Sequence, residues 1–317
     1  MSLKSCNTAN RACSLIYSYI KTYSQGRWLL PVNICPDVPL TFCIAGIEFE
    51  FVDININTLC IDEDECLKRL SDFSIEYVGL VFVRSYGYLS DTSEFFMNCK
   101  SIRPNIKILD DRCLCIPERI PDFYNSDMIL YSTGHCKQID LGGGGLAYYS
   151  SEETYYKDPN LMYDGTDEEA LYKKSYANNK ILSNIPQGWL KLDDYKDYDS
   201  YISEIDSKKL QRIFQREKIN TIYQENLPAK IQLPFAYNKW RFNIFVPCCL
   251  KEKILKELFA NGLFASCHYH SANKLFNRKV YPHSDKIYDS IINLFNDDNY
   301  SVDQALQTTE IINKIVQ

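Results

Sequence analysis

Short hydrophobic runs recur through the first half of the chain, separated by longer segments of mixed polarity. Several of these runs are continuously apolar instead of alternating between apolar and polar residues. Continuous runs are typical of strands covered on both faces, as in a parallel sheet between two layers of helices. The predicted strands span residues 28–34, 47–54, 77–83, 106–110, 127–132 and 145–150.

The segments between these runs favour helices. Apolar residues recur at helical spacing over residues 9–23. Residues 62–72 carry acids at the start and basic residues near the end, an order that suits the dipole of a helix. Residues 91–103 begin with Asp91, which we predict to cap a helix. Strands that alternate with helices predict a doubly wound α/β layer.

The second half of the chain has a different composition. Residues 151–230 are rich in Tyr, Asp, Lys and Asn, which predicts helices and loops at the surface or at a subunit contact. A β pattern resumes later in the chain and alternates with helical segments. We therefore predict a large α/β domain over residues 1–205 and a smaller α+β domain over residues 206–317.

The predicted small domain has its own signals. Residues 239–247 and 263–270 have the pattern of strands, and residues 250–262 have that of a helix followed by glycine, as is common at a helix end. A last helix is predicted after Ser301, because Gln304 stands three residues later, the spacing of a capping box.

Composition narrows the possible functions. The formal net charge of −6 disfavours a nucleic-acid-binding surface, which would be basic. The 13 cysteines contain no CxxC pair, which favours reduced thiols in the cytoplasm. The first residues lack the uninterrupted apolar stretch of a signal peptide, and no run reaches the length of a membrane span. We expect a cytoplasmic protein that binds neither nucleic acid nor membranes.

Two local motifs carry little weight on their own. The four glycines at 142–145 are not a Walker A loop, because no Gly-Lys-Ser/Thr follows them, and a strand instead of a helix comes next. The run Cys267-His268-Tyr269-His270 offers soft metal ligands, but no second pair stands at zinc spacing. We interpret these residues as the lining of a cleft and predict no metal site.

Lys137 is the strongest candidate for a catalytic residue. A buried lysine at a strand end can form a Schiff base with pyridoxal phosphate (PLP). PLP also needs a carboxylate at its ring nitrogen and donors for its phosphate. Asp110 and Asp111 end one predicted strand, and Ser132 ends the next, five residues before Lys137. The segment Thr8-Ala9-Asn10 precedes a helix whose first amides suit a phosphate.

With these residues in place, the chain resembles the sugar aminotransferases of the DegT/DnrJ/StrS type, within the fold-type I PLP-dependent enzymes. The resemblance covers almost the whole chain in colinear order. The segment NTANRACSL is similar to the family's phosphate-binding turn and the helix after it. The segment KILDDRCLC is similar to the family's strand that carries the ring-nitrogen carboxylate. The lysine segment of the family is similar to ILYSTGHCKQIDLGGGGLAYY.

The resemblance implies a fold and a set of site residues. The large domain is expected to be a three-layer α/β/α domain of the aspartate aminotransferase type, with a smaller α+β C-terminal domain. Lys137 and Asp111 are the implied catalytic residues, with Asp110 as the alternative acid. The implied cofactor contacts are Thr8, Ala9, Asn10, Tyr86, Asp111, Ser132 and Lys137. Substrate contacts are expected from Asn33, His268 and Tyr269, and Asn178 or Asn179 is expected to reach the phosphate of a partner subunit.

The resemblance also implies a reaction and an assembly. Family members are homodimers that transfer an amino group, usually from glutamate, to a keto sugar on a nucleotide, in surface polysaccharide or related sugar biosynthesis. Here Arg84 replaces the histidine of the "HxYG" turn, and Arg112 follows the key acid where alanine is usual. These departures leave two alternatives open: a PLP enzyme with a different reaction, such as a dehydratase, or a non-catalytic regulatory descendant.

Overall fold

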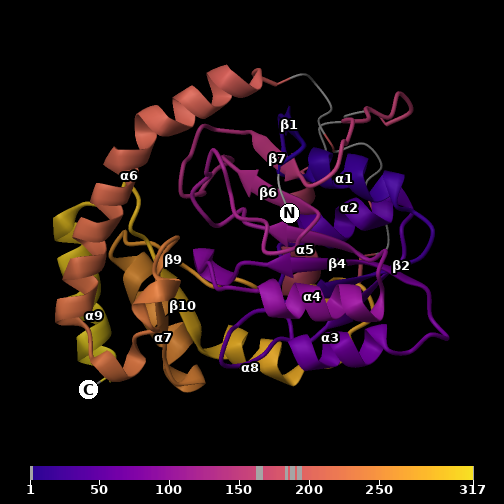
Figure 1. The fold of residues 1–317 in the computed structure, drawn as a ribbon. Coiled ribbons are helices and arrows are strands. Elements are labelled where there is room, and N and C mark those ends of the chain that lie inside the picture. The colour runs from indigo at the N-terminus through magenta and orange to yellow at the C-terminus, as the bar shows by residue number, and fades with distance from the viewer. Residues whose placement is uncertain (1–2, 162–166, 183–184, 186–189, 191–194, 317) are drawn as a thin grey trace.

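A seven-stranded sheet forms the centre of the larger part of the molecule (Figure 1). The computed structural model describes residues 3–161, 167–182, 185, 190 and 195–316. The strands are β1 (Ser5–Ala9), β2 (Arg27–Pro31), β3 (Phe49–Val52), β4 (Tyr77–Val83), β5 (Lys107–Asp111), β6 (Met128–Ser132) and β7 (Gly145–Tyr149). Their spatial order is β1-β7-β6-β5-β4-β2-β3. β7 is antiparallel to both of its neighbours, and the other neighbouring pairs are parallel.

Helices cover both faces of this sheet. On one face, α1 (Ala12–Thr22) and α2 (Asp37–Ala45) share a buried apolar cluster with β-strand residues such as Leu109 and Leu130. On the other face, Ile108 belongs to a cluster with α3 (Glu63–Leu70) and α4 (Ser93–Ile102). The start of α6 (Tyr198–Asn226) packs against Ile129 on that same face. These three layers confirm the predicted α/β/α architecture.

A second, smaller sheet lies at the left of Figure 1. It consists of β8 (Phe242–Phe245), β10 (Ile291–Leu294) and β9 (Ala265–Ser266), in that order and antiparallel. α7 (Cys248–Ala260), α9 (Val302–Val316) and the second half of α6 bury their apolar residues against it. This part of the chain is therefore the predicted α+β unit.

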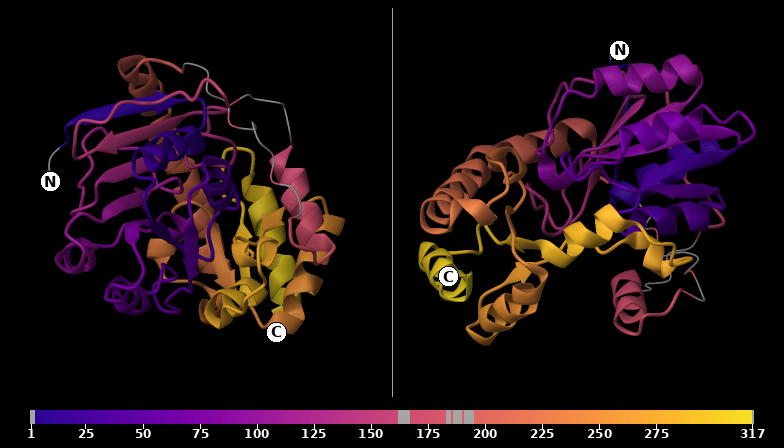
Figure 2. Two further views of the ribbon diagram at one scale, coloured as in Figure 1. Left: turned by 90° about the vertical axis from the view of Figure 1, so that its right-hand side faces the viewer. Right: turned by 90° about the horizontal axis from the view of Figure 1, so that it is seen from below.

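α6 connects the two sheets as one continuous helix of 29 residues (Figures 1 and 2). Tyr201 packs with the large sheet, whereas Tyr223 is buried with the small sheet. The predicted boundary after residue 205 falls inside this helix. Part of the later chain returns to the large domain, since α8 (Pro282–Ser290) begins against β3 and the amide of Ser284 donates to Asp53 Oδ1 over 3.0 Å.

Two predicted helix starts can be compared with the structure. The capping box at α9 is confirmed, because the Ser301 amide donates to Gln304 Oε1 and the Gln304 amide donates to Ser301 Oγ. The prediction for α4 was wrong by one residue, since Thr92 is the N-cap. Asp91 lies just before the helix, and its side chain accepts hydrogen bonds from the amide and the hydroxyl of Ser93, the first residue of α4. Within the described ranges, no helix has the length and apolar character needed to span a membrane.

Candidate active site

The carboxyl ends of the parallel strands gather at one edge of the large sheet. β1, β5 and β6 run in the same direction, so Ala9, Asp111 and Ser132 end their strands at this edge. Gly145, the first residue of antiparallel β7, pairs there with both Ala9 and Ser132. Ligands of open α/β sheets bind outside this edge. The fold therefore brings residues from three predicted site segments together.

Asp110 and Asp111 are neighbours on β5 but face opposite sides of the sheet, because side chains alternate along a strand. Asp110 is fully buried between two arginines, with Arg84 Nε 2.7 Å from Oδ1 and Arg112 Nη2 2.8 Å from Oδ2. Burial disfavours its charge, but the two guanidinium groups hold its pKa below the ordinary value. Asp110 is therefore committed to a structural ion cluster.

Asp111 faces the cleft beneath α1 and α2. Its side chain is 6% exposed, and its Oδ1 accepts a hydrogen bond of 2.9 Å from the amide of Cys113. Burial raises the pKa of this carboxyl above the ordinary value. A buried carboxylate that no arginine neutralises is suited to pair with a cationic group of a ligand. Between the two alternatives, the geometry favours Asp111 over Asp110.

Ser132 and the glycine run pack tightly against the start of α1. Ser132 Oγ makes only long hydrogen bonds, 3.4 Å to the Gly144 carbonyl and 3.3 Å from the Gly134 amide. A Cβ on Gly145 would lie 2.6 Å from Cα of Ala12, the first residue of α1. The absence of a side chain at 145 therefore lets the helix N-terminus approach the strand end, where its amides favour an anion.

Lys137 lies in the loop that follows β6. Its amide donates to the carbonyl of Gly134 over 3.2 Å. Its own carbonyl accepts a hydrogen bond of 3.2 Å from Arg216 Nη2, a side chain of α6. The lysine backbone is thus fixed both within its loop and from the helix that links the two domains.

The ammonium of Lys137 faces four acidic groups. Burial alone lowers the pKa of Lys137, but Cys113, Cys35, Asp111 and Asp37 together raise it above the ordinary value. Among the described residues, no carboxylate forms an ion pair with this ammonium within 4.0 Å. Lys137 and Asp111 therefore lie near each other, and they form no salt bridge within 4.0 Å in the described chain.

The three predicted phosphate contacts at the end of β1 differ in their surroundings. The hydroxyl of Thr8 donates to the carbonyl of Lys196 over 2.8 Å. Thr8 and Asp111 point to opposite faces of the sheet, so the Thr8 side chain does not reach the Asp111 face. Ala9 is fully buried, and Asn10 accepts a hydrogen bond at its carbonyl from the Gly144 amide. Of the three, Asn10 lies nearest to the start of α1, and the phosphate contacts themselves stay a prediction.

Tyr86 and Asn33 were predicted to face the ligands. Tyr86 is 2% exposed, and its hydroxyl donates to the His268 carbonyl over 2.7 Å, so it packs beneath the returning C-terminal segment. Asn33 is buried after β2 and donates to the Leu59 carbonyl, while its Oδ1 has no hydrogen-bond partner among the described residues. Asn33 keeps an unpartnered polar atom, and the contact of Tyr86 with a ligand stays a prediction.

His268 and Tyr269 lie between the two domains. The amide of His268 donates to Asn293 Oδ1 over 2.7 Å, and its Nδ1 is buried without a hydrogen-bond partner in the described chain. Burial, with smaller contributions from Arg241 and Lys137, lowers the pKa of His268 to about 4. Tyr269 is close enough to Asp111 for the carboxylate to add to the rise in its pKa that burial causes. Both residues reach the cleft of Lys137.

Arg11, Asp37 and Glu168 were not predicted as site residues, whereas His270 belongs to the run interpreted as the lining of a cleft. Arg11 Nη2 lies 2.6 Å from Glu168 Oε1 of α5 (Glu168–Ala177) and 4.0 Å from Asp37 Oδ2. Burial raises the pKa of Asp37 to about 6. His270 stacks on Tyr176 with ring centres 4.3 Å apart. Asp37 could have been found as an acid in the first turn of a helix, but α2 was not predicted.

Asn178 and Asn179 follow α5 and are exposed. The Asn178 side chain donates to the carbonyl of Lys174 over 2.8 Å. Their contact with a partner subunit stays a prediction. Among the described residues, no group of three His, Cys, Asp or Glu side chains is placed to hold a metal ion.

No protein-family model and no curated protein sequence matches the chain. Solved structures match it closely in fold. A DegT DnrJ EryC1 StrS aminotransferase from Brucella abortus has a TM-score of 0.72 at 14% identity, covering 99% of this chain and 86% of its own. The sugar aminotransferase CalS13 from Micromonospora echinospora has a TM-score of 0.70 at 14% identity, covering 98% and 87%.

A third similar structure is NtdA from Bacillus subtilis with bound cofactor PMP. Its TM-score is 0.69 at 16% identity, covering 98% of this chain and 74% of its own. These three similarities extend over both domains. The chain therefore has the fold-type I architecture of PLP-dependent aminotransferases, with a large α/β/α domain and a smaller α+β domain.

Proposed function

We propose that this protein is a PLP-dependent aminotransferase that transfers an amino group from glutamate to a nucleotide-linked keto sugar. The observation that carries the proposal is the proximity of Lys137 and Asp111 at the carboxyl edge of the sheet, where each influences the pKa of the other. The similarity in fold to the sugar aminotransferase CalS13, and to NtdA solved with bound PMP, supports it.

The described residues fit this cofactor. Asp111 is a buried carboxylate without a cationic partner, as a ring nitrogen requires. Ser132 Oγ and the first amides of α1 would hold the phosphate, next to a Gly145 that leaves no room for a Cβ. When bound, PLP supplies an aldehyde and an electron-accepting ring. The described residues therefore include a partner for the ring nitrogen, for the phosphate and, in Lys137, for the aldehyde of PLP.

Each residue then has a distinct task. Asp111 would accept a hydrogen bond from the ring nitrogen. Its raised pKa makes it a stronger proton acceptor than an aspartate with the ordinary pKa. Nζ of Lys137 would take up and return the proton of the substrate carbon. Cys113 orients Asp111 through its amide, and Arg216 fixes the Lys137 backbone. Tyr269 and His268 would exclude water from the side of the small domain.

Absorption spectroscopy tests this proposal. Wild-type protein incubated with PLP is expected to gain a visible band that persists through gel filtration, and glutamate is expected to convert it. Lys137→Ala should lose the band, whereas Lys208→Ala, on the surface of α6, should keep it. Mass spectrometry of a keto sugar incubated with glutamate then detects the amine. A wild-type protein that stays colourless with PLP would refute the proposal.

The proposal includes a homodimer. Apolar side chains are exposed on either side of Asn178 and Asn179, with Leu171 37% and Ile181 51% exposed. Light scattering after gel filtration should give about twice the chain mass of 36.9 kDa. Ile181→Lys should lower that mass if this region is the subunit contact. A wild-type mass equal to that of a single chain would exclude a dimer.

A further inference from the structure

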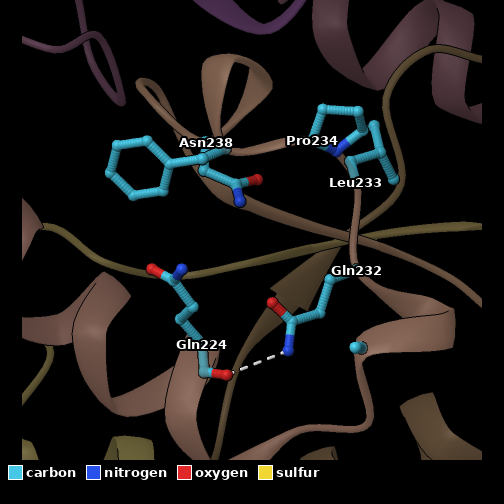
Figure 3. Close-up of a pocket in the computed structure, with 7 residues that line it drawn as sticks. Gln224, Gln232, Leu233, Pro234 and Asn238 are labelled. Carbon is cyan, nitrogen blue, oxygen red and sulfur yellow. Dashed lines mark hydrogen bonds between the residues drawn. The ribbon is translucent and has the colours of Figure 1, made fainter.

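A groove runs beside the Lys137 loop, separate from the cleft of Lys137 and Asp111. It consists of two cavities, of about 430 and 340 Å³, that share Phe235 and Asn238 in their walls. Figure 3 shows the smaller one, with Gln224 of α6, Gln232 and Asn238 among its lining residues. A volume of several hundred Å³ is typical of small-molecule sites. Neither Lys137 nor Asp111 lines either cavity in the described chain.

The larger cavity has an apolar wall and a cationic excess. Leu89, Ile116, Ile213 and Phe235 are among its apolar lining residues. Its charged lining consists of the cations Lys209, Arg216 and Lys239 and the carboxylates Glu118 and Glu217. Pockets of this kind bind molecules with an apolar body and a few polar groups that set the orientation.

Arg216 is the most distinctive of these lining residues. It is 6% exposed, and its Nη1 donates to the Trp240 carbonyl over 2.7 Å and to Asn296 Oδ1 over 2.5 Å. Its Nε has no hydrogen-bond partner, and no carboxylate within 4.0 Å pairs with it in the described chain. Burial lowers the pKa of Arg216 to about 10, although Asp297 and Asp298 favour its charge from a longer distance. A buried charge without a counter-ion in contact is costly. An anion in the adjacent cavity would offset this cost.

Arg216 also connects the groove to the cleft. Its Nη2 donates to the carbonyls of Lys137 and Gln138, over 3.2 and 3.4 Å. Gln138 itself lines the cavity. The groove and the candidate active site therefore share the backbone of one short loop.

We propose that this groove is a second ligand site, which takes a small flat molecule with an apolar body and one carboxylate. The body packs between Ile213 and Phe235, and the carboxylate is attracted by Lys209, Lys239 and the buried Arg216. Occupancy of the groove restrains the Lys137 loop through Arg216 and Gln138. The site itself does not depend on the proposed aminotransferase function.

Calorimetric titration with two matched probes tests the site. 2-Naphthoate should bind once per chain, whereas the neutral 2-naphthamide should bind at least about tenfold more weakly. The double variant K209Q/K239Q should weaken naphthoate binding about tenfold and leave naphthamide unchanged. Lys218→Gln, on the exposed side of α6, is the control and should change neither. Equal affinity of the two probes, or no binding of either, would overturn the proposal.

Two further measurements test the location and the coupling. Ile213→Trp should fill the cavity and abolish naphthoate binding while the circular dichroism spectrum and melting temperature are kept. Hydrogen exchange of the peptide over residues 134–141 should slow when naphthoate is added. Slowing confined to peptides of α6 and of residues 229–239 would overturn the coupling to the loop. Both measurements are made on protein with and without added PLP, so their failure is distinct from a failure of the proposed reaction.

Discussion

The two adjacent acids of β5 should respond to the same substitution in opposite ways. Asp110→Asn removes the negative charge between Arg84 and Arg112, both of which are almost fully buried. Asp111→Asn removes a buried carboxylate that has no cationic partner within ion-pair distance among the described residues. The two variants differ by one position on one strand, so each is the matched control of the other.

The magnitudes follow from burial and pairing. Removing one partner of a buried ion pair typically costs 3–5 kcal/mol, so Asp110→Asn should lower the free energy of unfolding by about 3 kcal/mol or more. That is a large part of the roughly 5–15 kcal/mol that stabilises a typical domain. Burial raises the pKa of Asp111, so its charge is unfavourable in the fold, and Asp111→Asn should change the stability by no more than about 1 kcal/mol.

Urea unfolding followed by circular dichroism measures the stability difference, and absorption spectroscopy measures cofactor binding. Asp110→Asn should unfold at clearly lower urea but keep the PLP band at low temperature. Asp111→Asn should unfold like the wild type but give an altered band and lose the conversion by glutamate. Equal stability losses in the two variants, or a cofactor defect confined to Asp110→Asn, would refute the assignment of the two carboxyls.

Three other predictions concern pH and packing at the cleft. Because burial raises the folded-state pKa of Asp37 from 3.8 to about 6, ionisation opposes folding above that pH. Asp37→Asn should therefore stabilise the protein by about 3 kcal/mol at pH 8 and by little at pH 4 in urea titrations, and a gain at pH 4 alone would contradict this. Gly145→Ala should displace Ala12 and weaken PLP binding at least about tenfold in an absorbance titration, while Gly143→Ala, whose Cβ would make an ordinary contact, should not. His268, with a pKa of about 4, stays neutral from pH 6 to 8, so His268→Asn should not change the shape of the pH–rate profile there.

The sequence predicted the large sheet well because its strands are short and continuously apolar. All six predicted strands in the first half correspond to β2–β7, with ends displaced by a few residues. β1 was missed because residues 5–9 are SCNTA, which is half polar at an edge of the sheet. α2 was missed because it is apolar around most of its circumference and thus lacks the amphipathic pattern of a surface helix.

The candidate site was predictable where residues follow strand ends. Asp111 and Ser132 could be placed because parallel strands end at the same edge of the sheet. The choice between Asp110 and Asp111 needed the strand register, which decides the face that each side chain occupies. Arg216 contacts the Lys137 backbone from a segment about 80 residues later in the chain, and no local pattern indicates such a contact.

The length of α6 has a mechanical consequence. A straight helix of 29 residues is about 43 Å long, and its two halves are buried in different cores. If the helix rotated as a rigid body by about 5° about the point where Tyr201 packs, its far end would move by about 4 Å. Because both halves of α6 are buried, a change of angle at its large-domain end would be transmitted to the small-domain core.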